Sequence, residues 1–183
     1  MRVITGSAKG RKLTAPPGMK TRPTGAVVKE SVFSAIQFEV EGAAVLDLFA
    51  GSGQMGIEAL SRGARSCVFV ENAKAVLSVA EENLKSTGLS GKSRLVGGDA
   101  LSYVQNAKDC LYDIAFLDPP YQSPGLEKLL TALGGIMSES GIIICETDSA
   151  EALPEKAGGL VKYREYRYGK TKITIYRNTE DFQ

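Results

Sequence analysis

Residues 45–56 read VLDLFAGSGQMG and carry three patterns in succession. The run VLDLF is apolar and rich in strand-forming residues. It is followed by GSGQMG at residues 51–56, which has the spacing G-x-G-x-x-G, and then by the helical pattern QMGIEALSR. Glycines let the backbone approach a ligand closely, and the first turn of a helix offers unpaired N–H groups. This order of strand, loop and helix therefore predicts a nucleotide-type binding loop.

The same alternation continues along the chain. From residue 43 onward, five β-rich runs are each followed by a helical pattern. The pairs are AAVLDLF with QMGIEALSR, SCVFVE with AKAVLSVAEENLKSTG, SRLVGGD with ALSYVQNA, YDIAFLD with SPGLEKLLTALGG, and SGIIICE with SAEALPEKA. Five such repeats predict an α/β fold with a parallel sheet covered by helices on both faces.

Both ends of the chain depart from this pattern. Residues 159–177 contain two β-rich runs separated by YGKT, which predicts an antiparallel hairpin. Residues 2–16 resemble a small hairpin with a glycine-containing turn, and residues 26–40 resemble an amphipathic helix. We therefore expect an N-terminal hairpin extension over residues 1–25 and one main domain over residues 26–183.

Composition excludes several classes of protein. A chain of 183 residues with 43% hydrophobic residues suits one main domain. It has no apolar run of membrane-spanning length and no signal-peptide pattern, so we expect a cytoplasmic protein without membrane contact. The three cysteines are scattered and histidine is absent, which argues against a metal site, a disulfide framework, and Ser-His-Asp or Cys-His catalysis. Carboxylates, backbone groups or a cofactor must supply any chemistry.

Charge is unevenly distributed along the chain. Residues 1–30 hold seven Lys and Arg against one acid, and residues 156–177 hold seven against one. Residues 31–155 hold eight against seventeen, so two basic ends flank an acidic middle. This distribution favours contact of the two ends with a polyanion such as nucleic acid. Either basic cluster by itself would be explained equally well as ordinary surface charge.

Three carboxylates follow or end successive predicted strands. Glu71 could accept hydrogen bonds from both hydroxyls of a ribose, and the glycine loop with Glu71 alone favours a dinucleotide about as strongly as any other ligand. Asp47 would repel a pyrophosphate but suits a positively charged amino-acid group, and Asp99 could accept from an adenine amino group. Each acid singly could be a helix cap, Asp99 above all. Together they favour S-adenosylmethionine.

A second motif, FLDPPY at residues 116–121, ends the fourth predicted strand. With strand order 3-2-1-4-5, this segment lies beside the glycine loop, so the two sites would share one crevice. The prolines stiffen the segment and remove backbone donors. Asp118 and the Pro119 carbonyl could then accept the two hydrogens of a planar amino group, while Tyr121 stacks on its ring. This arrangement suits methylation of an exocyclic amine.

VLDLFAGSG together with DPPY is similar to the amino-group methyltransferases of the class I fold. RVITGSAKGRKL, TRPTGAVVKESVFSAI and YGKTKITIYR extend the match, and the chain resembles the bacterial 16S rRNA guanine-N2 methyltransferases of the RsmD type. The resemblance implies a Rossmann-like, mostly parallel sheet of seven strands in the order 3-2-1-4-5-7-6. It also implies methylation of one guanine of 16S rRNA in a small-subunit assembly particle.

The motifs, the resemblance and the two basic ends of the chain together give candidate residues for three roles. Cofactor binding falls to Asp47, Phe49, Gly51, Gly53, Glu71, Asn72, Asp99 and Ala100. Catalysis falls to Asp118, Pro119, Pro120 and Tyr121. The candidates for RNA contact are Arg2, Lys9, Arg11, Lys12, Arg22, Thr24, Lys170 and Lys172. Residues 25–27 read GAV where relatives commonly have Thr-Asp-Arg, and the loss of a basic residue bears on how RNA is held.

Three rival functions remain. A DNA adenine-N6 or cytosine-N4 methyltransferase shares the DPPY motif but usually adds a target-recognition domain, for which 183 residues leave no room. Protein glutamine methyltransferases carry Asn rather than Asp before the prolines. A cofactor-binding RNA assembly factor without turnover is the non-enzymatic alternative, against which Asp118 and Tyr121 argue. We expect a monomer that uses no metal.

Overall fold

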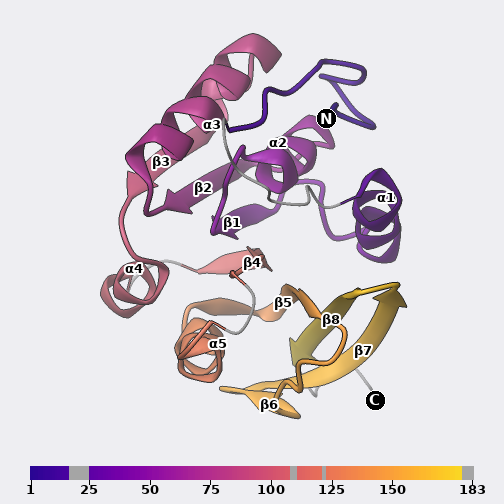
Figure 1. Cartoon of the computed structure of the whole chain (residues 1–183), viewed down its shortest axis with the longest axis vertical. Coiled ribbons are helices and arrows are strands. Elements are labelled where there is room, and N and C mark those ends of the chain that lie inside the picture. Colours follow the sequence, from indigo (N-terminus) through magenta and orange to yellow (C-terminus); the bar gives the residue numbers. More distant parts are fainter. Residues whose placement is uncertain (17–24, 108–110, 121–122, 179–183) are drawn as a thin grey trace.

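A computed structural model describes residues 1–16, 25–107, 111–120 and 123–178 (Figure 1). The elements are α1 Ala26–Ala35, β1 Ala44–Leu48, α2 Gln54–Ser61, β2 Ser66–Glu71, α3 Lys74–Thr87, a 3-10 turn Ser90–Lys92, β3 Ser93–Gly97, α4 Ala100–Asn106, β4 Tyr112–Leu117, α5 Leu126–Gly134, β5 Met137–Asp148, β6 Lys156–Ala157, β7 Leu160–Tyr168 and β8 Thr171–Asn178. The alternation of strands and helices is the predicted α/β pattern up to β5.

One sheet runs through the molecule with the strand order β3-β2-β1-β4-β5-β8-β7-β6. Strands β1 to β5 are parallel, and β8 and β7 are antiparallel to their neighbours. The predicted sheet had seven strands. The observed sheet has an eighth, the two-residue β6 paired with β7, so the predicted count and order are wrong at this edge. A strand of two residues leaves no periodicity for sequence reasoning to detect.

Helices cover both faces of the sheet, as the continuous apolar strands predicted. On one face, Val45, Phe69 and Phe116 pack with residues of α1, α2 and α3. On the other face, Leu46 and Leu117 pack with residues of α4 and α5. Figure 1 shows the two groups of helices on opposite sides of the strands. All five residues of β1 are buried, so the glycine loop follows the most enclosed part of the sheet.

The fifth predicted helix, over SAEALPEKA, is absent. Residues 151–155 have no helix or strand, and the chain passes from β5 to β6 as a loop. Pro154 has no N–H for a helical hydrogen bond, and its carbonyl accepts from the Tyr176 hydroxyl at 2.8 Å. Leu153 is buried against the α5 side of the sheet. Tertiary contacts with β8 thus replace the local hydrogen bonds of a helix.

The N-terminal segment, residues 1–16, is a closed loop rather than a regular hairpin. A single antiparallel bridge joins Arg2 to Lys12, and Val3 N donates to the Arg11 carbonyl at 3.0 Å. Val3, Ala8 and Leu13 are buried in the core beside α2. The predicted hairpin is therefore correct in the direction of its two arms and wrong in extent.

None of the helices in the described part of the chain has the length and apolar character of a membrane-spanning segment.

Candidate active site

The glycine loop lies at the carboxyl edge of the parallel strands, directly after β1. Phe49 has a φ of 62°, and Gly51 and Gly53 have φ of 57° and 78°, so the backbone turns through left-handed conformations between the strand and α2. A Cβ at Gly56 would lie 2.4 Å from the Phe69 ring and 2.6 Å from the Cys67 sulfur. The last glycine of the motif therefore allows α2 to pack on β2, which aims the first turn of the helix at the loop.

Asp47 lies beneath this loop and is almost wholly buried, with 4% of the residue exposed. Its Oδ2 accepts from the Gly56 N–H at 2.9 Å. Burial raises the pKa of Asp47 to about 7, with repulsion from Glu71 adding to the rise and the Gly56 hydrogen bond opposing it. A cationic group in the loop would favour the ionised form, which the protein alone disfavours.

Glu71 ends β2 and holds the glycine loop from the neighbouring strand. Its Oε2 accepts from the Gly51 N–H at 3.1 Å, and its Oε1 accepts from the Ala73 N–H at 2.9 Å. Each carboxylate oxygen can accept a second hydrogen bond. The half-buried carboxylate is thus fixed in orientation and retains acceptor capacity for a pair of hydroxyls. Asn72 follows it and is exposed.

Asp99 is the N-cap of α4. Its Oδ2 accepts from the Ser102 N–H at 2.8 Å, which satisfies one donor of the first helical turn. Ala100 is buried behind it. The helix-cap alternative raised by the sequence thus describes this residue in the structure, and a contact with adenine stays a prediction.

The acceptor motif, residues 118–121 (DPPY), directly follows β4. Because β4 lies between β1 and β5 in the sheet, the motif is at the same edge as the glycine loop. Asp118 and Pro120 are exposed and Pro119 is buried. Tyr121, the fourth predicted catalytic residue, lies outside the described residues, as do the predicted RNA contacts Arg22 and Thr24. The strands thus bring the two predicted motifs together at one edge, although they are more than sixty residues apart in sequence.

Glu146 is a carboxylate at this edge that sequence reasoning missed. Phe116 pairs with Ile144 and Leu117 with Cys145, so one residue further on Asp118 and Glu146 become neighbours. The pKa of Asp118 is raised, first by loss of solvation and then by repulsion from Glu146 and Asp47. Because Asp118 is exposed, water screens the repulsion between these carboxylates.

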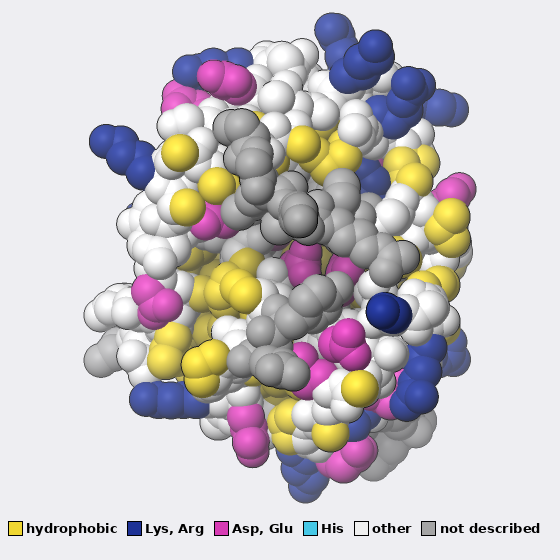
Figure 2. Space-filling view, viewed as in Figure 1, with side chains coloured by type: hydrophobic (Ala, Val, Ile, Leu, Met, Phe, Trp, Pro, Cys, Tyr) yellow, Lys and Arg dark blue, Asp and Glu magenta, His cyan; other side chains and the backbone are white. Residues whose placement is uncertain are grey.

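The available signal for Glu146 was its place at the end of the fifth apolar run, SGIIICE. The carboxylates of the first three runs are assigned to the cofactor and Asp118 of the fourth run to catalysis, and nothing in the sequence assigns a role to Glu146. Figure 2 shows acidic side chains near the centre of the visible face and at several places on its rim, while Lys and Arg lie mostly around the rim and form a basic border.

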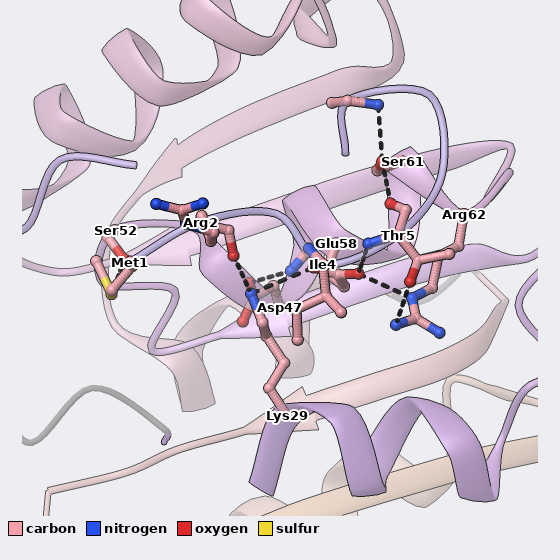
Figure 3. A network of polar contacts seen from close by, with 12 residues as sticks. Met1, Arg2, Ile4, Thr5, Lys29, Asp47, Ser52, Glu58, Ser61 and Arg62 are labelled. Carbon is pink, nitrogen blue, oxygen red and sulfur yellow. Dashed lines mark hydrogen bonds and ion pairs between the residues drawn. The ribbon is translucent and has the colours of Figure 1, made fainter. Parts of the chain in front are cut away.

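A buried polar network fixes the N-terminal segment against α2 (Figure 3). Glu58 of α2 is fully buried and accepts from the backbone N–H groups of Ile4 and Thr5 at 2.8 and 2.9 Å. It also pairs with Lys29 of α1 at 3.2 Å and with Arg62 at 2.9 Å. One carboxylate thus ties the N-terminal segment and α1 to the helix that begins at the glycine loop.

Asn83 of α3 makes a second attachment. Its amide group donates to the carbonyls of Thr14 and Ser52 at 3.0 and 2.9 Å, and its Oδ1 accepts from the Thr14 N–H at 2.8 Å. Ser52 belongs to the glycine loop. The N-terminal segment is therefore attached near the glycine loop at residue 14 as well as at residues 4 and 5.

The predicted RNA contacts differ in their exposure. Arg2, Lys9, Arg11 and Lys12 of the N-terminal segment and Lys170 of the β7–β8 turn are exposed. Lys172 is only 3% exposed, donates to the Glu151 carbonyl and lies 3.5 Å from Glu165. The prediction that Lys172 contacts RNA is therefore wrong, because its ammonium group is buried and interacts with Glu151 and Glu165 within the protein.

A surface hollow at the opposite edge of the sheet does not belong to this site. Its lining includes Glu39, Glu41, Asp113 and Arg177, near the amino ends of β1 and β4. Arg177 is already paired with Glu39 at 2.6 Å. The carboxyl edge, where both sequence motifs meet, is the candidate active site, as expected for an open parallel sheet.

Comparisons with known proteins agree on one family. A family model described as "Conserved hypothetical protein 95" matches residues 1–177. "Putative rRNA methyltransferase YlbH" of Bacillus subtilis is 42% identical over 181 residues, which cover 97% of this chain and 98% of that protein. "Ribosomal RNA small subunit methyltransferase D" of Escherichia coli K12 is 34% identical over 179 residues, which cover 91% of this chain and 89% of that protein.

A solved structure of a related protein has the same fold. "Putative methyltransferase yhhF" from Escherichia coli superposes with a TM-score of 0.86 at 32% identity, and the match covers 97% of each chain. The likeness therefore extends over the N-terminal segment as well as the sheet. With nearly the whole chain matched by the family model and by these relatives, the protein belongs to the RsmD/YlbH family of S-adenosylmethionine-dependent methyltransferases.

Proposed function

We propose that this protein methylates the exocyclic N2 amino group of one guanine in 16S rRNA of the small ribosomal subunit. The observation that carries the proposal is the Asp118-Pro119-Pro120 segment at the end of β4, beside the glycine loop of β1. The name of the Escherichia coli relative, a small-subunit rRNA methyltransferase, supports rRNA as the substrate class. Family membership supports the methyl-transfer chemistry.

The residues at the carboxyl edge fit S-adenosylmethionine. Glu71 has the orientation and acceptor capacity for the ribose hydroxyls, and Asp47 offers a buried carboxylate to a cationic ligand. Phe49, Gly51, Gly53, Asn72, Asp99 and Ala100 complete the proposed cofactor set. When bound, the cofactor supplies a sulfonium methyl group, whose transfer breaks a C–S bond and leaves the electron pair on sulfur.

Asp118 and Pro119 would hold the amine for in-line transfer. The Asp118 carboxylate and the Pro119 carbonyl each accept one N2 hydrogen, which directs the nitrogen lone pair out of the ring plane toward the methyl group. A new N–C bond forms, and the nitrogen then gives up one proton to Asp118 or to water. We propose that Tyr121 stacks on the guanine ring and that Pro120 stiffens the segment.

RNA would be held by the basic border of the site. Arg2, Lys9, Arg11, Lys12 and Lys170 are exposed and remain the proposed contacts among the described residues, with Arg22 and Thr24 proposed from the family match alone. We propose residues 1–25 as the RNA-binding extension and residues 26–183 as the methyltransferase domain. The proposed setting is a cytoplasmic monomer that acts on a small-subunit assembly particle without a metal ion.

The test is to incubate the protein with labelled S-adenosylmethionine and three substrates: small-subunit particles, naked 16S rRNA and double-stranded DNA. We expect label in RNA, and nuclease digestion with mass spectrometry should identify N2-methylguanine at one position. Label in DNA would favour the rival DNA methyltransferase. Cofactor binding without transfer to any substrate would favour an assembly factor, and either result would reject the proposed reaction.

A further inference from the structure

Glu146 lies beside Asp118 at the carboxyl edge of the sheet. The β4–β5 register pairs Phe116 with Ile144, and both side chains belong to the core cluster on the α1 and α2 side of the sheet. Side chains alternate along a strand, so Glu146, two residues after Ile144 in β5, projects from this same face. Asp118 directly follows β4 and lies close enough to Glu146 for their charges to interact. Glu146 is half-buried, and Asp118 next to it is exposed. Two carboxylates therefore stand side by side at the mouth of the site.

Adjacent carboxylates repel each other, and a ligand that brings hydrogen-bond donors to both relieves this repulsion. The Watson–Crick edge of guanine carries three hydrogens on neighbouring atoms, two on N2 and one on N1. Adenine and cytosine place an acceptor nitrogen beside their amino group, and uracil has no amino group. Guanine is therefore the only one of the four RNA bases whose amine and adjacent ring nitrogen both donate.

We propose that Glu146 is a specificity-determining residue whose carboxylate accepts the N1–H of the target guanine while Asp118 and Pro119 hold its N2 amino group. This inference rests on the proposed function and adds to it the reason why guanine is selected. Glu146 has other interactions within the protein, but a carboxylate offers about four acceptor positions, so one more N–H can be accommodated. An adenine or cytosine would place a lone pair against the carboxylate and be rejected.

The inference is tested with the variant Glu146→Gln and the base analogue 2-aminopurine, which keeps the 2-amino group but has an acceptor at N1. The target guanine is first mapped with the wild-type protein, and 2-aminopurine is then placed at that position in synthetic RNA ligated into 16S rRNA. We expect Glu146→Gln to lower kcat/KM on guanine by roughly tenfold, since the amide oxygen that replaces the carboxylate is a neutral and weaker acceptor for the N1–H. Because a glutamine amide can donate to the N1 of 2-aminopurine, the preference for guanine over the analogue should fall at least roughly tenfold.

The control is Glu139→Gln, which makes the same change at the opposite end of β5 and should leave the preference intact. Binding of S-adenosylmethionine, measured by calorimetry, should match the wild type for both variants. Equal loss on guanine and 2-aminopurine, no loss at all, or loss of cofactor binding in Glu146→Gln would each overturn the role of Glu146 and leave the proposed function standing. If the wild type makes no N2-methylguanine, the proposed function fails and this inference fails with it.

Discussion

At the scale of single residues, the site depends on carboxylates held where ionisation is unfavourable. Burial raises the pKa of Asp47 to about 7, and loss of solvation with repulsion from Glu146 raises the pKa of Asp118. A cationic cofactor and an amine with two N–H donors would each favour the charged forms. Binding of both proposed ligands would therefore offset the unfavourable ionisation of these acids.

Asp118→Ala and Asp118→Asn should abolish or strongly reduce methyl transfer, with kcat lowered by roughly 100-fold or more, as for other losses of a positioned polar group at a reacting centre. Affinity for S-adenosylmethionine should stay the same, because the cofactor loop does not depend on this side chain. The measurements are single-turnover rates and calorimetric titration of the cofactor. Glu127→Gln on the exposed face of α5 is the control. Wild-type turnover by either Asp118 variant would reject its catalytic role.

Asp47 should make stability depend on pH. Its pKa rises from 3.8 to about 7 on folding, so between these values the folded state binds more protons than the unfolded state. Its contribution to the free energy of unfolding is therefore greatest near pH 4, declines as pH rises, and levels off above about pH 7. Asp47→Asn removes this contribution, and urea unfolding between pH 5 and 8 should show a smaller decline than in the wild type. Parallel profiles for the two proteins would contradict the assigned shift.

At the scale of elements, α2 connects the glycine loop to the N-terminal segment. The helix begins at the glycine loop, and Glu58 in its second turn accepts from the backbone of Ile4 and Thr5. Burial lowers the pKa of Lys29, and the neighbouring Glu58 opposes this shift. An ion pair so buried contributes little net stability while intact, but is costly when one partner loses its charge.

Glu58→Gln should therefore lower the free energy of unfolding by roughly 3 to 5 kcal/mol, since Lys29 is left buried without its counter-charge. Glu81→Gln is the matched control, because Glu81 and Lys85 form an exposed pair on α3 worth below about 0.5 kcal/mol. Both values come from urea denaturation. The double variant Lys29→Met with Glu58→Gln should recover part of the loss. A Glu58→Gln effect as small as that of Glu81→Gln would show that the network does not hold the segment.

At the scale of the whole molecule, basic side chains are unevenly placed. On the face shown in Figure 2, Lys and Arg lie mostly around the rim, whereas acidic side chains lie both on the rim and near the centre. An RNA backbone at the rim would release counterions from each phosphate it contacts, so affinity should fall steeply with salt. A flipped guanine would meanwhile place its N–H donors at the acidic side chains near the centre.

Charge reversal of Arg11 and Lys12 to Glu should weaken RNA binding and reduce its salt dependence. For two phosphate contacts the slope of log K against log salt should fall by about 1.4 to 1.8. Binding of a labelled 16S rRNA fragment is measured by fluorescence anisotropy at salt concentrations from roughly 50 to 300 mM, where such slopes can be determined. Lys128→Glu on α5 serves as the control, since it is exposed and lies outside the N-terminal segment. An unchanged slope in the double variant would place the RNA interface elsewhere.

The sequence by itself determined the strand–loop–helix unit at residues 45–61, the parallel core and the acceptor motif, because local patterns encode buried strands, glycine turns and proline breaks. Only the tertiary structure decided that Glu146 stands beside Asp118, that Lys172 is buried, and that residues 151–155 form a loop. Each of these depends on which strands become neighbours. The physical reason is that the register between distant strands, and the burial it imposes, are properties of pairs of segments, which no single stretch of sequence contains.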